Sequence, residues 1–137
     1  MNRASRWGNR MRLLLVLLIA FVAACDRGVM VTYRVSMTTA EADSIIQLGV
    51  AISRTVAQRH AMRSQGTQDG CSLASYYRQV GNGGDWLDFC VAREAASVKF
   101  HIEAWRTGEW GSPGDALRVD VRDTLLTQFG QRVTETK

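Results

Sequence analysis

An apolar run from Leu13 to Ala24 limits what this chain can fold into, because it separates a targeting segment from the folded part. The run has 12 residues, whereas a helix that crosses a bilayer needs about 20. A buried core helix would not be apolar on all sides. Four arginines and no acidic residue precede the run: Arg3, Arg6, Arg10 and Arg12. A basic segment followed by a short apolar one is typical of a secretory signal, so we predict that residues 1–24 are removed.

The end of the run, Val22-Ala23-Ala24-Cys25, resembles the lipobox of bacterial lipoproteins. In that family the cysteine sulfur receives a diacylglyceryl group, the chain is cut just before the cysteine, and the new amino group is usually acylated. A thiolate is the nucleophile that can take the lipid. The resemblance covers residues 1–25 only. It implies that Cys25 is lipidated and that several acyl chains hold the protein to a membrane.

The residue after this cysteine bears on location. Asp26 resembles the signal that keeps enteric-type lipoproteins in the inner membrane. We therefore expect a periplasm-facing protein of the cell envelope, with the inner membrane favoured over the outer. Residues 25–28 form the lipidated cysteine and a short tether, which spans about 10 Å at about 3.3 Å per residue. The domain is expected to lie against the bilayer surface.

The charge of the mature chain does not favour a nucleic-acid partner. The whole chain has a formal net charge of +4, but the signal holds four of its 17 Lys and Arg residues and none of its 13 Asp and Glu residues. The mature chain therefore carries 13 residues of each sign and is formally neutral. Nucleic-acid binding requires a basic face on the folded domain.

Residues 29–137 are expected to form a single α+β domain. Apolar and polar residues alternate over 29–37, as in a half-buried strand. A capping box at Thr38 and Glu41 predicts a helix that runs to about Arg63. Further segments predict three strands and a last helix: strands 71–80, 85–94 and 97–106, and a helix from Ser112 and Pro113 to about Gly130. The order β-α-β-β-β-α predicts a four-stranded, mainly antiparallel sheet with two helices on one face, and no strand after the second helix.

Two cysteines of the domain, Cys71 and Cys90, form an even pair in an exported protein, which predicts a disulfide. They are not a CxxC pair, and a zinc site would need more ligands. A turn at GNGG places Cys90 opposite Ser75 rather than Cys71. Cys71 is therefore expected in the loop before its strand, with the bridge on the sheet face that the helices do not cover.

The sequence contains no strong catalytic motif. His60 lies near a helix end, where a cation needs no ligand. His101 and Glu103 are two residues apart on one strand, and Asp88 is expected on the neighbouring strand. The three could bind a metal or move protons if they converged, but a polar outer sheet face explains them more simply. We expect no metal, no cofactor and no enzymatic activity.

Three tryptophans are the candidate partner-binding residues: Trp86, Trp105 and Trp110. Exposed together, they would form a hot spot for a protein partner, or a patch at lipid headgroups. The sequence favours a non-catalytic protein-binding lipoprotein, either an accessory of an envelope assembly or an inhibitor or immunity protein against a periplasmic toxin. A small-ligand carrier is the alternative, and an enzyme that uses His101, Glu103 and Asp88 is a weaker one.

The lipid anchor can be tested directly. Cys25→Ser should leave an uncut, unlipidated precursor, because a hydroxyl does not replace the thiolate as lipid acceptor. Metabolic labelling with a fatty acid, followed by electrophoresis, measures both properties. Equal labelling of the wild type and the variant would contradict the assignment.

Overall fold

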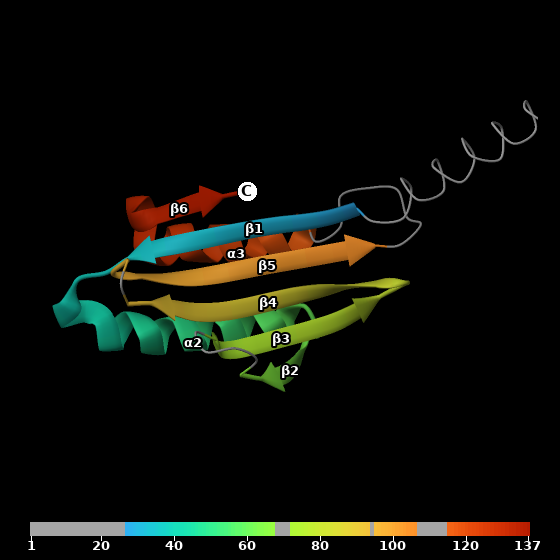
Figure 1. The fold of residues 1–137 in the computed structure, drawn as a ribbon, viewed down its shortest axis with the longest axis horizontal. Helices are drawn as coiled ribbons and strands as arrows, with labels where there is room; N and C mark the ends of the chain where they lie inside the picture. The colour runs from blue at the N-terminus through green and yellow to red at the C-terminus, as the bar shows by residue number, and fades with distance from the viewer. Residues whose placement is uncertain (1–26, 68–71, 94, 107–114) are drawn as a thin grey trace, which may run out of the picture.

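Within the residues that the structure describes, the backbone forms one six-stranded antiparallel sheet with two helices on one face (Figure 1). This computed structural model describes residues 27–67, 72–93, 95–106 and 115–137. The strand order in the sheet is β2-β3-β4-β5-β1-β6. The elements are β1 (Arg27–Ser36), η1 (Thr39–Glu41), α2 (Ala42–Arg59), β2 (Arg63–Gly66), β3 (Ser72–Val80), β4 (Gly83–Ala92), β5 (Ser97–Arg106), α3 (Asp115–Phe129), η2 (Gly130–Arg132) and β6 (Val133–Thr136).

The predicted four-stranded sheet is wrong, because β2 and β6 add a short strand at each edge. All four residues of β2 are exposed, and β6 has one half-buried residue followed by three exposed ones. Neither strand therefore carries the alternating apolar pattern that predicts a strand. The first helix ends at Arg59, before the predicted Arg63. A strand also follows the second helix, contrary to the sequence expectation.

The hydrophobic core lies between the two helices and the central strands. Alternate residues of β1 and β5 face the helices in register, with Val31 opposite Ile102 and Tyr33 opposite Phe100. Phe100 is also opposite Phe89 of β4, and their ring centroids are 4.8 Å apart. The buried stripe of α3 is the predicted one, with Leu117, Val121 and Leu125 enclosed and Phe129 half-buried. These elements form because one face of each is apolar.

The capping box that the sequence predicts is present at the start of η1, which leads directly into α2. The Thr38 backbone N–H donates to Glu41 Oε2 at 3.1 Å, and the Thr38 hydroxyl donates to the same oxygen at 2.7 Å. Arg132, just before β6, donates to Glu41 and also to the Ser36 carbonyl. Hydrogen bonds from Thr38, with help from Arg132, hold the pKa of Glu41 below its usual value. The contacts join the end of β1, the start of α2 and the turn before β6.

Helix α2 approaches β4 closely because Gly49 lacks a side chain. A Cβ atom on Gly49 would overlap the ring of Phe89. Phe89 is fully buried, so its ring has little room to move aside. At this position α2 and β4 are therefore in direct contact, as in other close-packed protein interiors.

Both helices lie on the same side of the sheet, with α2 against β4 and α3 against β1 and β6 (Figure 1). In the part of the chain that the structure describes, no helix covers the opposite face of the central strands (Figure 1). We call it the uncovered face, and its outward-pointing residues alternate with the core residues along each strand.

Gly49→Ala tests the close packing of α2. Alanine has the better helix propensity, by roughly 0.5–1 kcal/mol, but overpacking against Phe89 typically costs about 1–3 kcal/mol. We expect a net loss of about 1–2 kcal/mol in the free energy of unfolding, measured by denaturant titration.

The control for this variant is Gln47→Ala, an exposed position of the same helix, which should change stability by less than about 0.5 kcal/mol. Adding Phe89→Leu to Gly49→Ala should recover part of the loss by making room. A Gly49→Ala protein as stable as the wild type would show that α2 does not pack this closely.

Candidate functional site

The uncovered face carries an aromatic cluster at one end, formed by Tyr77, Trp86 and Trp105. Tyr77 of β3 is directly opposite Trp86 of β4, and their ring centroids are 4.6 Å apart at an angle of 41°. Trp105 of β5 is opposite Gly84 of β4, where a Cβ atom would collide with the Tyr77 ring. Because Gly84 has no side chain, the Tyr77 ring can lie over the backbone of β4 at this position. All three aromatic residues are half-buried.

Polar residues occupy the middle of the same face. Asp88 of β4 is opposite His101 of β5, which is in turn opposite Thr32 of β1. His101 Nδ1 and Thr32 Oγ1 form a hydrogen bond of 2.9 Å. Glu103 lies two residues further along β5, opposite Trp86. The predicted group Asp88, His101 and Glu103 thus shares one sheet face.

Sharing a face does not make these three residues a metal site. In the part of the chain that the structure describes, no three His, Cys, Asp or Glu side chains are close enough together to hold a metal ion. His101 directs one ring nitrogen to Thr32 rather than to a carboxylate. The arrangement gives the enzyme alternative no specific support beyond the shared face.

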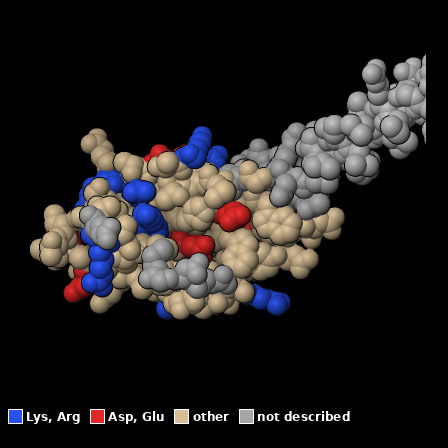
Figure 2. Space-filling model, in the orientation of Figure 1, with Lys and Arg blue, Asp and Glu red and all other residues tan. Residues whose placement is uncertain are grey.

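Charge is distributed unevenly over the uncovered face (Figure 2). Acidic side chains lie near its middle, and a band of Lys and Arg lies toward the end where β1 finishes. Arg34 and Lys99, which are paired across β1 and β5, belong to that basic end. The aromatic cluster is at the opposite end, where β1 begins, since Trp105 is opposite Gly28.

Cys90 lies on the uncovered face with Asp88 and Trp86, as the alternation predicts, but the predicted register is wrong. The turn is formed by Gly81 and Asn82 alone, because Val80 is already paired with Gly83. Cys90 is therefore opposite Ser72, beside a bulge between Ser72 and Ala74. Cys71 lies outside the described residues, and its disulfide stays a prediction. The observed register places Ser72, the residue after Cys71, opposite Cys90.

Several other predicted residues lie outside the part of the chain that the structure describes. They are the lipidation residue Cys25, the sorting residue Asp26, the partner-binding candidate Trp110, and the predicted helix start at Ser112 and Pro113. The structure places Trp86 and Trp105 on one face, as predicted.

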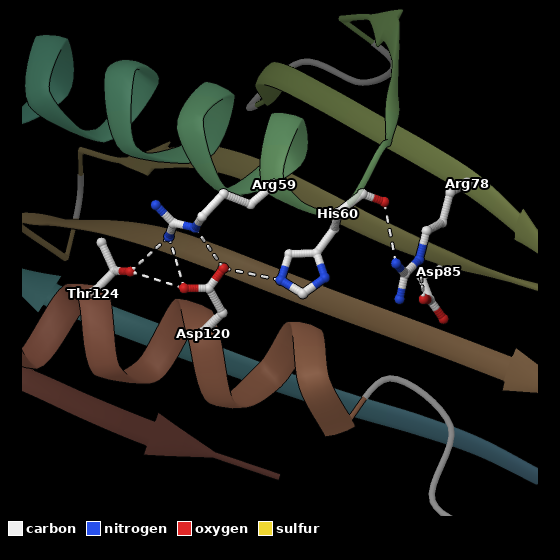
Figure 3. Close-up of polar contacts among 6 residues, drawn as sticks. All are labelled: Arg59, His60, Arg78, Asp85, Asp120 and Thr124. Atoms are coloured by element: carbon white, nitrogen blue, oxygen red, sulfur yellow. Dashed lines mark hydrogen bonds and ion pairs between the residues drawn. The ribbon is translucent and has the colours of Figure 1, made fainter.

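A second polar cluster joins the two helices on the covered side of the sheet (Figure 3). Arg59, at the end of α2, donates from Nη2 to Asp120 Oδ1 at 2.7 Å and from Nε to Oδ2 at 2.9 Å. The same Nη2 donates to the hydroxyl of Thr124 at 3.1 Å. His60 Nε2 lies 2.9 Å from Asp120 Oδ2. Burial raises the pKa of Asp120, but the hydrogen bonds from Arg59 and His60 outweigh it and leave the pKa below its usual value.

The same cluster secures the end of α2 to the sheet. Arg78 of β3 donates from Nη1 to the His60 carbonyl at 3.1 Å and from Nε to Asp85 of β4 at 2.7 Å. The Asp85 side chain is fully buried. Arg78 therefore satisfies one of the carbonyls that a helix end leaves without a partner. A buried pair with these contacts is explained by its structural role, because either charge alone would be costly.

Sequence reasoning interpreted His60 as an ordinary surface residue and missed this cluster. His60 is half-buried, with 14% of its side chain exposed. One signal was present, since Asp85 has the same strand parity as the buried residues Leu87 and Phe89. A carboxylate on the core side of a strand predicts a buried cation partner.

A pocket of about 220 Å³ lies at the start of α2, lined by residues that include Met37, Ile46, Val91 and Arg93. Ligand sites are typically larger, at about 300–1,000 Å³. The pocket opens at the end of the sheet, away from the aromatic cluster, since Val91 pairs with Val98 near the end of β4.

No family model matches this sequence, and no curated protein matches it. Among the described residues, neither helix combines the length and the apolar character that spanning a membrane would require. The candidate site is therefore defined by geometry alone, as the aromatic cluster and the polar residues beside it on the uncovered face.

The disulfide can be tested by counting thiols. Protein purified and denatured without reductant should show no reactive thiol at Cys71 or Cys90, because both sulfurs would be bonded to each other. The predicted bridge closes a loop of roughly 20 residues and should contribute about 3 kcal/mol to stability. After reduction, both should react, and the melting temperature should fall. Two reactive thiols before reduction would rule the bridge out.

Proposed function

We propose that this protein is a lipid-anchored envelope protein that binds another protein through its uncovered face and catalyses no reaction. The observation that carries the proposal is the aromatic cluster of Tyr77, Trp86 and Trp105 on the face without helices. Half-buried tryptophan and tyrosine side chains are over-represented among interface residues that contribute most to binding. They offer large apolar area at a low cost in side-chain entropy.

The predicted lipid anchor and the aromatic cluster are at the same end of the domain. β1 begins at Arg27, two residues after the predicted lipidation site, and Gly28 is opposite Trp105. The aromatic cluster is therefore at the membrane end of the domain if Cys25 carries the lipid. A partner that contacts it would lie at the bilayer surface, in the periplasm. This position suits both an accessory of an envelope assembly and an inhibitor or immunity protein.

Exposed apolar residues on the helix side supply a contrast within the same molecule. Leu48 of α2 is 38% exposed and Leu126 of α3 is 46% exposed. The two residues lie on different helices, and scattered apolar side chains of this kind are normal on a protein surface. The uncovered face instead groups three aromatic residues with Met30, which is 59% exposed and lies opposite Glu103.

Trp105→Ala tests the proposal. A central interface tryptophan typically contributes at least 2 kcal/mol, so binding of the partner should weaken about thirtyfold. A core tryptophan would instead cost about 3–5 kcal/mol of stability when truncated. We expect the variant to keep most of its melting temperature and to lose the proteins that the wild type captures from detergent-solubilised envelope.

Leu126→Ala is the matched control, because it removes an exposed apolar side chain from the helix side. It should leave both capture and melting temperature unchanged. If the Trp105→Ala protein unfolds, or captures the same partner at full affinity, the binding face must be sought elsewhere on the protein. Trp86→Ala should reproduce the Trp105→Ala result if the cluster acts as one surface.

A further inference from the structure

Asp88 and Glu103 are diagonal neighbours on the uncovered face. Asp88 is opposite His101 and Trp86 is opposite Glu103, so the four residues form a square across β4 and β5. Diagonal positions in an antiparallel pair are within reach of long side chains. All four side chains are half-buried. One group of suitable size could therefore contact both carboxylates and the Trp86 ring together.

The two carboxylates differ from most others in the described part of the chain. Asp85, Asp120 and Glu41 each hold an arginine in an ion pair. Among the described residues, the carboxylates of Asp88 and Glu103 form neither an ion pair nor a side-chain hydrogen bond, although Lys99 lies on the same face two residues before His101. Two neighbouring carboxylates that hold no cation of their own attract a positively charged group.

The hydroxyl of Ser75 is a second and independent polar group without a partner beside this square. Ser75 is directly opposite Asp88 on the same face. Its side chain is 1% exposed, and its oxygen has no hydrogen-bond partner among the described residues. Buried hydroxyls are usually paired, with protein or with water. A donor group beside Asp88 could satisfy this oxygen as well.

We propose that Asp88, Glu103 and Trp86 form a subsite that receives an arginine side chain of the partner protein. The inference rests on the protein-binding function proposed above and names the chemistry of the partner. A guanidinium group is planar and carries five N–H donors in a fork, so it can stack on the Trp86 ring and donate to both carboxylates. The charge of the guanidinium complements the acidic middle of the face (Figure 2). Lysine has no planar group with which to do both.

The experiment uses the mature protein in a zwitterionic detergent and three short, otherwise neutral peptides with a central arginine, lysine or citrulline. Citrulline has nearly the shape of arginine but no charge. Binding is followed through the indole N–H signals of the tryptophans in NMR spectra. We expect the arginine peptide to bind, the Trp86 signal to move most, and the lysine and citrulline peptides to bind at least about tenfold more weakly.

The double variant Asp88→Asn with Glu103→Gln should bind the arginine peptide at least about tenfold more weakly, because both changes keep side-chain size and remove charge. The matched control is Asp43→Asn with Asp123→Asn, which removes two exposed charges from the helices. It should change the affinity by less than about twofold, since distant charges are screened by salt. Melting temperatures show whether each variant stays folded.

Four results would overturn the inference: no binding of the arginine peptide, equal binding of the arginine and citrulline peptides, equal binding of the arginine and lysine peptides, or no effect of the Asp88 and Glu103 changes. Its failure can be told from failure of the proposed function. If Trp105→Ala loses the captured partner while the arginine peptide does not bind, the uncovered face binds proteins without this subsite. If Trp105→Ala captures the partner normally, the proposed function itself fails.

Discussion

The contact between Gly49 and Phe89 is the constraint on which the arrangement of layers depends. It lets α2 lie directly on β4, in the middle of the sheet, while α3 lies beside it against β1 and β6. The cluster around Asp120 then joins the end of α2 to α3. Because both helices occupy one face, the other face of the same strands carries the surface that we propose for partner binding.

The two faces of β4 show how one strand can contribute both to the core and to the proposed binding surface. Leu87 and Phe89 are fully buried under the helices. Trp86 and Asp88, which alternate with them, point to the uncovered face and are half-buried. The rigid packing of the first pair holds the backbone in place for the second. A recognition surface on a packed sheet loses little conformational freedom when a partner binds.

Much of the central fold could be predicted from the sequence, and the missing parts have physical causes. Strands β1, β3, β4 and β5 each bury one face or part of it, so alternation of apolar residues indicates them. The edge strands β2 and β6 are mostly exposed and carry no such pattern. The register of β3 and β4 depends on whether the turn has two or four residues, and GNGG permits both. Gly81 has a positive φ, which suits the tight two-residue turn that the structure contains.

The candidate site was predictable in part for the same reason. Alternation alone places Trp86, Asp88, His101, Glu103 and Trp105 on one side of the sheet. The stacking of Tyr77 on Trp86 requires the register, and the contacts of Asp120 join residues 60 or more positions apart. Local patterns carry no information on contacts at that separation. The buried Asp85 is the exception, because its strand parity was visible in the sequence.

The position of β1 within the sheet also has a mechanical consequence. β1 lies between β5 and β6 and is paired with β5 at ten positions along its length. If Cys25 is fixed in a bilayer, tension on the domain enters at the first residue of this strand and acts along its axis. The hydrogen bonds on both sides of β1 then share the load in shear, whereas a strand peeled away sideways would lose them one at a time. The domain would therefore resist being unfolded by tension on its anchor.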